Sequence, residues 1–148
     1  VHTMGYNSRL DDLHAAILSV KLRRLDAWSD RRREIAALYT AGLQGTGLKL
    51  PAARAGYRHV YHLYVIETER RDEMLQYLNQ AGIDAKTHYP IAIHQQAGFP
   101  WGYPADLNVS LPLTEKSAAS VISLPMFPEL TQAEIETVIG TVRAWMKK

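Results

Sequence analysis

The sequence predicts an α+β fold, a small antiparallel or mixed sheet with helices packed on one face, preceded by a long interface helix. Apolar residues recur at intervals of three and four over residues 8–43 and again over residues 131–145, which is typical of helices buried along one side. Between them, residues 57–66 are dense in aromatic and β-branched side chains, which favour a strand. We expect residues 1–50 to form a linker and interface helices, and residues 51–148 to form the small α+β domain.

The composition limits the class of protein. The chain has 148 residues, the length of one domain, and its 47% hydrophobic and 22% charged residues are typical of a chain that folds. Lysine and arginine total 17 against 15 aspartate and glutamate, so the formal charge of +2 gives no general attraction to nucleic acid. The absence of cysteine excludes disulfides and thiol nucleophiles. Without a signal peptide or a membrane-spanning run, we expect a cytoplasmic protein with no nucleic-acid or membrane partner.

The first helical segment is expected over residues 8–43. Ser8 and Asp11 have the spacing of a capping box, in which a hydroxyl and an acid three residues later satisfy free backbone N–H groups. The apolar stripe changes phase between Leu25 and Asp30, where we expect a break between two consecutive helices. The stripe comprises Leu10, Leu13, Ile17, Val20, Leu25, Trp28, Ile35, Leu38 and Tyr39.

The predicted strand over residues 57–66 carries large side chains at both alternating sets of positions. We therefore expect it to be covered on both faces, or on one face and by an interface. A helix over residues 69–80 follows, and Gly82 is expected to end it. Residues 83–88 are expected to form a second short strand.

The segment over residues 89–112 contains four prolines and two glycines, so regular structure is not expected there. A loop of this length inside a compact domain tends to be functional. A short helix over residues 114–121 and a third strand over residues 121–124 follow. A capping box of Thr131 to Glu134 opens the last helix, whose buried stripe is expected to comprise Ile135, Val138, Ile139, Val142 and Trp145.

The segment before the first helix offers the residues of an anion site. Gly5, Asn7 and Arg9 place a flexible backbone, an amide and a guanidinium at a helix N-terminus, whose free N–H groups favour phosphate. From the local chemistry alone, plain capping of the helix by Asn7 and Ser8 is the favoured explanation of the same residues. The basic residues of the segment 21–33 are interleaved with acids, which fits a solvated helix surface better than a nucleic-acid patch.

Neither a metal site nor a catalytic residue is predicted from the residues themselves. His59 and His62 point to opposite faces if their strand is regular. His88 and His94 bracket a turn, but no acid lies close enough in the sequence to complete a ligand set with them. The common glycine-rich phosphate, serine-hydrolase and zinc-protease motifs are absent from the sequence.

Four blocks of sequence carry a family resemblance in their order and spacing. In the block of residues 5–18, the first twelve residues match the pattern G-x-N-x-R-[LM]-D-x-[LI]-x-A-A, and residues 60–65, 82–94 and 123–131 follow in the family's order. In this respect the chain resembles the DegT/DnrJ/StrS family of pyridoxal-phosphate-dependent sugar-nucleotide aminotransferases. The resemblance covers essentially the whole chain and implies that it is the C-terminal small domain of a fold type I aminotransferase.

The resemblance also implies roles for individual residues. In the dimers of this family, the asparagine matched by Asn7 reaches the cofactor phosphate of the neighbouring subunit, and Arg9 lies near that contact. His88, Tyr89 and His94 match the H-Y-P-x-x-x-H loop beside the sugar-nucleotide site, so they are expected to contact the substrate. The resemblance therefore implies cofactor-binding residues before the first helix and substrate-binding residues in the proline-rich segment.

For the intact enzyme, the resemblance implies pyridoxal 5′-phosphate as cofactor and a homodimer. The reaction would be transfer of an amino group from an amino acid, expected to be glutamate, to a keto-deoxysugar nucleotide, with a 3-keto sugar on dTDP favoured. Such enzymes make deoxyaminosugars for polysaccharides or antibiotics. The alternative is a non-catalytic truncated homologue that acts as an oligomerisation or regulatory module.

The resemblance places the Schiff-base lysine in a large domain that would precede Val1. Lys21, Lys49, Lys86 and Lys116 do not lie in the family's lysine motif. Because the lysine both holds the cofactor and moves a proton, we expect this chain alone to bind no cofactor and to be inactive. The start at Val1, without an initiator methionine, is consistent with a processed chain or a piece of a longer protein.

Overall fold

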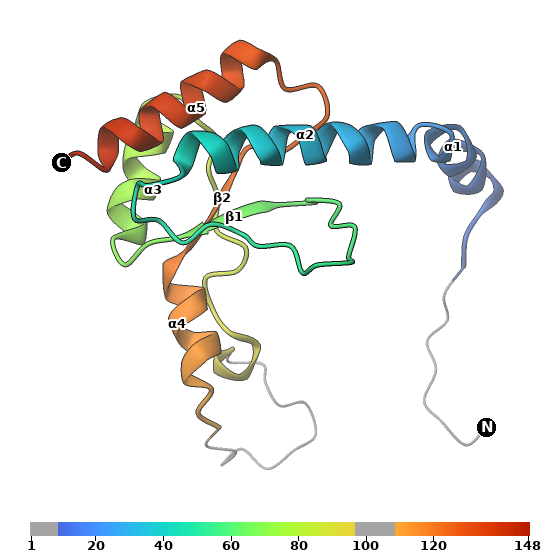
Figure 1. The fold of residues 1–148 in the computed structure, drawn as a ribbon. Helices are drawn as coiled ribbons and strands as arrows, with labels where there is room; N and C mark the ends of the chain where they lie inside the picture. The colour runs from blue at the N-terminus through green and yellow to red at the C-terminus, as the bar shows by residue number, and fades with distance from the viewer. Residues whose placement is uncertain (1–8, 97–108) are drawn as a thin grey trace.

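The computed structural model describes residues 9–96 and 109–148 (Figure 1). Within these residues, helices surround a small two-stranded antiparallel sheet, which confirms the predicted α+β class. No helix of the described chain is long and apolar enough to cross a membrane. The elements in chain order are α1 (Asp12–Leu22), α2 (Leu25–Leu43), β1 (Tyr64–Glu67), α3 (Arg71–Gln80), the 3-10 turn η1 (Ile93–Gln95), α4 (Pro112–Ser120), β2 (Val121–Leu124) and α5 (Gln132–Trp145).

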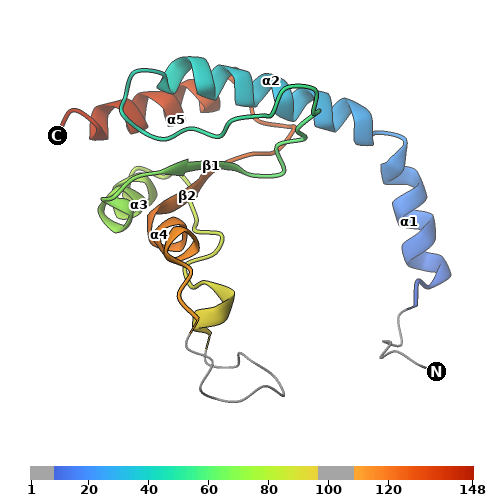
Figure 2. The ribbon, with the colours of Figure 1, turned by 60° about the horizontal axis from the view of Figure 1, so that its bottom comes forward.

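The helices are arranged on both sides of the two strands. Helices α2 and α5 lie side by side on one side of β1 and β2, and α3 packs against α5 and β2 (Figures 1 and 2). Helix α4 lies on the opposite side from α2 and α5 in both views and leads directly into β2. The expectation of helices on one face therefore holds for the α2–α5 pair and does not describe α4.

Helix α1 begins at Asp12 rather than at the predicted Ser8, which lies outside the described residues. Asp11 is its N-cap, and the Oδ1 atom of Asp11 accepts a hydrogen bond from the backbone N–H of His14 at 2.9 Å. A carboxylate can satisfy a free N–H group of the first turn without help from a hydroxyl upstream. The break between the helices lies at residues 23–24, slightly before the predicted position, because α2 already begins at Leu25.

The first strand is shorter than predicted. Only Tyr64–Glu67 pairs with β2, with Tyr64 opposite Leu124 and Ile66 opposite Ile122. The chain before it is irregular because Tyr61 has a φ of +47°, a conformation that no strand residue adopts. The Nδ1 atom of His59 accepts a hydrogen bond from the backbone N–H of Tyr61 at 2.9 Å, which gives that N–H a local partner in place of a strand.

The predicted strand over residues 83–88 is reduced to a single bridge. Lys86 pairs with Ser123 of β2 through two backbone hydrogen bonds, of 3.1 and 2.7 Å. On the other edge of the sheet, Lys49 forms an equivalent bridge with Glu67 of β1. Each strand of the sheet thus has one further residue hydrogen-bonded along its outer edge. The prediction for residues 121–124 is confirmed, and this strand is buried throughout.

The core lies between α2, α5, α3 and the strands. Gly42 of α2 allows the close approach of α5, because a Cβ atom there would lie 2.6 Å from the Cδ1 atom of Ile139. The predicted capping box of α5, formed by Thr131 and Glu134, is confirmed. The largest fully buried side chains are Tyr39, Tyr64, Ile35, Leu43, Ile66, Met74, Leu78, Ile122, Ile135 and Val142.

Two buried tyrosines anchor α2 to the strands. The hydroxyl of Tyr39 donates to the backbone carbonyl of Pro125 at 3.0 Å, and the hydroxyls of Thr40 and Tyr64 lie 2.9 Å apart. Burial raises the pKa of Tyr39 and of Tyr64 above the ordinary phenol value. Both hydroxyls therefore stay neutral and hydrogen-bonded, as buried polar groups require.

Helix α1 carries an apolar surface that the described chain does not cover. None of its residues is buried, and the helix extends from the N-terminal end of α2 away from the sheet (Figure 2). We call residues 9–25, which comprise α1 and the residues on either side of it, the arm. The apolar stripe predicted over residues 8–43 is therefore buried only from α2 onward. The exposed apolar side chains of this arm are Leu10, Leu13, Ile17, Leu18, Val20, Leu22 and Leu25.

Candidate functional site

A groove separates α4 from the segment that carries the H-Y-P-x-x-x-H motif. Its volume is about 440 Å³. One wall is formed by residues 88–93 and the other by residues 113–118 of α4, and Val121 of β2 also lines the groove. Three large apolar side chains on its walls, Ile91, Ile93 and Leu113, are exposed to solvent. The groove therefore combines apolar walls with the polar groups of the motif.

His88 lines this groove and is held by the sheet. Its Nδ1 atom lies 2.9 Å from the Oγ atom of Ser123, a buried residue of β2. The backbone bridge between Lys86 and Ser123 brings this segment alongside β2 two residues before His88. The imidazole is therefore oriented by a hydroxyl that is itself fixed in the core.

Tyr89 differs from both histidines of the motif because it is exposed. It is 75% accessible to solvent, and its ring contacts the His88 ring edge-on with 5.7 Å between ring centroids. It also lines the groove. The phenol can therefore offer a hydrogen-bond donor and acceptor to a ligand that enters the groove.

His94 is held on the other side of the motif, against the start of α4. Its imidazole is only 7% exposed, and its Nε2 atom lies 2.9 Å from the Oε1 atom of Glu115. The same oxygen accepts the backbone N–H of Leu111, the N-cap residue of α4, at 2.8 Å. These two contacts, that with Leu111 first, hold the pKa of Glu115 below its ordinary value. His94 does not itself line the groove.

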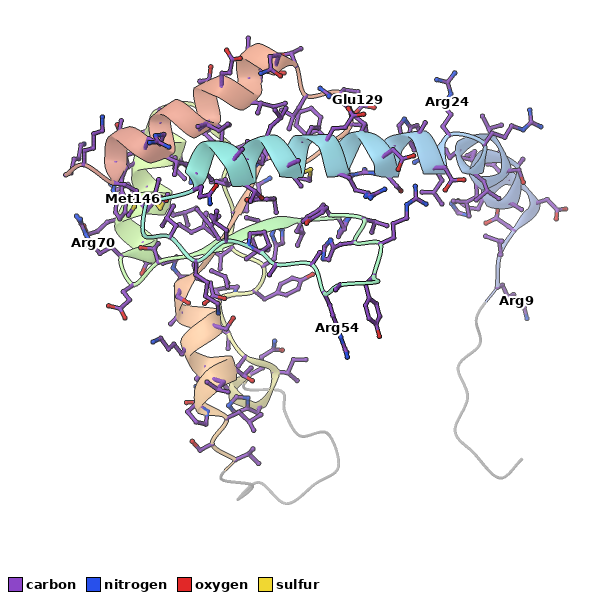
Figure 3. All side chains as sticks on the ribbon, viewed as in Figure 1. Arg9, Arg24, Arg54, Arg70, Glu129 and Met146 are labelled. Atoms are coloured by element: carbon purple, nitrogen blue, oxygen red, sulfur yellow. The ribbon has the colours of Figure 1, made fainter. Side chains whose placement is uncertain are left out.

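The predicted cofactor-binding residues lie in a different part of the molecule. Asn7 lies outside the described residues. Arg9 is exposed and precedes α1, at the end of the arm (Figure 3). Both views of the ribbon separate this arm from α4 and from η1 (Figures 1 and 2). The structure therefore brings His88, Tyr89 and His94 together within one segment, and Arg9 is not part of that group.

The lysines of the sheet region do not fit a Schiff base with a carbonyl cofactor. An amine that attacks a carbonyl must be unprotonated, which burial or a neighbouring cation favours. Lys49, Lys86 and Lys116 are instead 74%, 61% and 72% exposed. Each of them lies within 4.0 Å of a carboxylate oxygen. These three lysines therefore lack the buried setting in which an amine of this kind is activated.

The described residues also contain no group of three histidine, aspartate or glutamate side chains that could hold a metal ion. Two residues of the site, Ser123 and Glu115, were missed by the sequence reasoning. Ser123 is 35 residues from its partner His88, and Glu115 is 21 residues from His94. An acid in the first turn of a helix is a visible capping signal, but nothing local indicates that its second partner is a histidine.

The comparisons with known proteins agree with one another. A model of the DegT/DnrJ/EryC1/StrS aminotransferase family matches residues 1–143. The chain is 41% identical over 147 residues to a dTDP-3-amino-3,4,6-trideoxy-alpha-D-glucose transaminase of Streptomyces venezuelae, covering 99% of this chain and 38% of that protein. It is 42% identical over 145 residues to a pleiotropic regulatory protein of Geobacillus stearothermophilus, covering 95% of this chain and 38% of that protein.

Solved structures show the same relationship. The crystal structure of S. venezuelae DesV in complex with a ketimine intermediate matches with a TM-score of 0.89 and 40% sequence identity. The match covers 99% of this chain and 39% of that one. The chain thus spans well under half the length of the proteins that it matches. It belongs to the DegT/DnrJ/EryC1/StrS aminotransferase family, and it corresponds to the C-terminal part of such a protein.

Proposed function

We propose that this chain is the C-terminal part of a pyridoxal-phosphate-dependent transaminase that transfers an amino group from an amino acid, glutamate, to a keto-deoxysugar nucleotide. The observation that carries the proposal is the groove beside α4, which exposes the Tyr89 hydroxyl between two anchored histidines. A 3-keto sugar on dTDP is the proposed acceptor, because the relative from Streptomyces venezuelae is named as a transaminase that forms a 3-amino sugar of that kind.

In this proposal the chain binds and orients the acceptor. Tyr89 donates a hydrogen bond to an oxygen of the sugar nucleotide, and the apolar walls of the groove cover the face of the deoxysugar. The primary amine that binds the cofactor is supplied by residues outside these 148, because the exposed, ion-paired Lys49, Lys86 and Lys116 do not fit that role. We therefore propose that these 148 residues alone are inactive.

We also propose that the intact protein is a homodimer in which α1 lies at an interface. An apolar surface as extended as that of α1 usually contacts another protein surface. Arg9 precedes α1 and lies apart from α4 (Figures 1 and 3), which fits an arrangement in which Asn7 and Arg9 approach the cofactor phosphate of the neighbouring subunit. A guanidinium beside the N-terminus of a helix is suited to that phosphate.

The second candidate function is a non-catalytic oligomerisation or regulatory module. The relative from Geobacillus stearothermophilus, named as a pleiotropic regulatory protein, favours it, as does the uncovered apolar arm. Such a module would keep the interface of α1 and have no need for the polar groups of the groove.

Chemical trapping of the cofactor separates the two candidates. The full-length protein that contains these residues is incubated with pyridoxal phosphate, reduced with borohydride and digested for mass spectrometry. A transaminase gives a lysine peptide carrying the reduced cofactor, and that lysine lies outside these 148 residues. A full-length protein that traps no cofactor, while still forming dimers, would instead support the regulatory module.

A further inference from the structure

The segment that carries the H-Y-P-x-x-x-H motif is tied to the rest of the fold through the histidine at each of its ends. His88 is bound to the core through Ser123, and His94 is bound to α4 through Glu115. Residues 88–93, from the first attachment to the residue before the second, supply one wall of the groove, and Tyr89 is part of it. The wall formed by residues 88–93 is therefore held at both ends, and each attachment depends on a residue outside the motif.

Glu115 makes the attachment to α4 through a single oxygen atom. Its Oε1 atom accepts a hydrogen bond from the backbone N–H of Leu111, at 2.8 Å, and also lies 2.9 Å from the Nε2 atom of His94, with which it is hydrogen-bonded. The carboxylate lies in the first turn of α4, where the helix dipole favours a negative charge. Glu115 thus links the start of α4, at Leu111, to His94, the residue that follows the wall formed by residues 88–93.

The burial of His94 argues against a direct contact between this side chain and a ligand in the groove. Its imidazole is 7% exposed, whereas Tyr89 is 75% exposed and lines the groove. The imidazole nitrogen nearest to α4 is already engaged with Glu115. The side chain is therefore placed to hold the segment. His94 would affect a ligand indirectly, by fixing the position of residues 88–93 in the groove wall.

We propose that Glu115 is a positioning residue for the acceptor: its carboxylate holds His94 against α4 and so sets the width of the groove in which Tyr89 contacts the sugar nucleotide. This inference rests on the proposed function, since it names the residue that shapes the same site. A shift of about 1 Å in a positioned group can cost up to about 100-fold in rate. Loss of the Glu115 carboxylate is thus expected to weaken binding of the sugar nucleotide, although Glu115 does not line the groove.

The chain offers a matched control for the structural part of this role. Glu134 caps the N-terminus of α5 as Glu115 caps that of α4, because its carboxylate accepts the backbone N–H of Thr131 at 2.8 Å. No histidine contact accompanies it among the described residues. Replacement of either glutamate by alanine removes a helix cap, but only Glu115→Ala releases His94.

The experiment measures steady-state kinetics of the full-length protein with both substrates varied. For Glu115→Ala we expect the KM for the keto-sugar nucleotide to rise about tenfold, while the KM for glutamate, which reacts in a separate half-reaction, stays unchanged. Glu115→Gln keeps an oxygen that accepts both hydrogen bonds and should restore the KM. Glu134→Ala should leave both KM values unchanged. Equal increases for Glu115→Ala and Glu134→Ala would reduce the role of Glu115 to capping and overturn the proposal.

A double-mutant cycle tests whether Glu115 acts through His94. If it does, Glu115→Ala, His94→Ala and the double variant raise the KM for the sugar nucleotide by about the same factor, because each breaks the same link. Additive increases would show two independent contacts and contradict the inference.

Binding of dTDP-sugar measured by calorimetry separates this inference from the proposed function. A wild-type protein that binds the sugar nucleotide in a Glu115-dependent way, but transfers no amino group, supports the positioning role and refutes the transaminase. An active protein in which Glu115→Ala changes nothing supports the transaminase and refutes the positioning role. A protein that neither binds nor reacts with sugar nucleotides refutes both.

Discussion

The Nδ1 atom of His88 lies 2.9 Å from the Oγ atom of Ser123, and this contact connects the candidate substrate groove to the buried strand β2. The backbone of Ser123 also pairs with the backbone of Lys86. Strand β2 therefore positions both the backbone just before His88 and the His88 side chain. The segment that follows, which forms one wall of the groove, is thereby fixed at its start.

Replacement of Ser123 by alanine should loosen the start of the groove. The variant loses one partly buried hydrogen bond, so the free energy of unfolding should fall by about 1 kcal/mol. In the full-length protein the KM for the sugar nucleotide should rise as well, because His88 and Tyr89 lose their orientation. Urea denaturation and steady-state kinetics measure the two effects. Ser19→Ala, which removes an exposed hydroxyl bonded within α1, serves as the control.

Replacement of Tyr89 by phenylalanine should affect binding without affecting stability. The side chain is 75% exposed, so loss of its hydroxyl leaves no buried group unsatisfied. Loss of one hydrogen bond to the acceptor should raise the KM for the sugar nucleotide about three- to tenfold. Tyr77→Phe on α3, outside the groove, should leave the KM unchanged. An unaltered KM in Tyr89→Phe would remove this residue from the substrate site.

The contact between α2 and α5 predicts opposite effects at two helical glycines. Gly42→Ala places a Cβ atom 2.6 Å from Ile139, so this variant should lose about 1–3 kcal/mol of stability through overpacking. Gly140→Ala on α5 has no atom within 4 Å of the new methyl group, and it should gain about 0.5–1 kcal/mol from helix propensity. Thermal unfolding of the 148-residue chain measures both. Equal destabilisation of the two variants would contradict the packing described here.

The capping box of α5 predicts a loss of stability in acid. Hydrogen bonds from the backbone N–H and the hydroxyl of Thr131 lower the pKa of Glu134 from its ordinary value of 4.5. The unfolded chain therefore takes up this proton first as the pH falls. The contribution is complete above pH 4.5 and is lost as the pH falls through the lower pKa of the folded state.

The free energy of unfolding is measured by denaturation at a series of pH values between pH 6 and pH 3. It should fall less steeply with decreasing pH in Glu134→Gln than in the wild type, because the amide does not titrate in this range. Glu136→Gln, on the same helix, controls for the loss of one negative charge. If the free energy of unfolding of the wild type and of Glu134→Gln fell equally with decreasing pH, the capping box would not contribute to the loss of stability in acid.

The fold was predictable from the sequence wherever the signal was local. The Thr131–Glu134 capping box and the apolar spacing that follows it locate α5 correctly, and Gly82, with a φ of +80°, ends α3 as expected. The strand expected over residues 57–66 was too long because side-chain composition does not reveal the positive φ of Tyr61. The sequence also predicts the apolar face of α1, but its periodicity alone does not specify which surface covers that face.

The candidate site was predictable only in part for a related reason. The motif identified His88 and Tyr89, which line the groove, and His94, which is held beside it by Glu115. It did not separate the exposed tyrosine from the two anchored histidines, since that distinction depends on Ser123 and Glu115. Contacts across 35 and 21 residues arise only when β2 and α4 are packed against the segment.

The apolar arm predicts how the protein associates. Paired replacement of Leu13 and Ile17 by glutamate should abolish self-association of the full-length protein, because it places charges on the exposed apolar face of α1. The fold of the α2–α5 body should persist, since neither residue is buried in it. Light scattering and circular dichroism measure the two outcomes, and Glu136→Lys on α5 is the control. A dimer that survives both glutamates would place the interface elsewhere.

Amino transfer itself tests the account most directly. The full-length protein, loaded with pyridoxal phosphate, is supplied with ¹⁵N-glutamate and a dTDP-linked 3-keto-deoxysugar, and the sugar nucleotide is analysed by mass spectrometry. The account predicts a ¹⁵N-labelled amino sugar nucleotide from the full-length protein and none from the 148-residue chain. Labelled product from the 148 residues alone, or none from the full-length protein with any keto-sugar nucleotide, would contradict it.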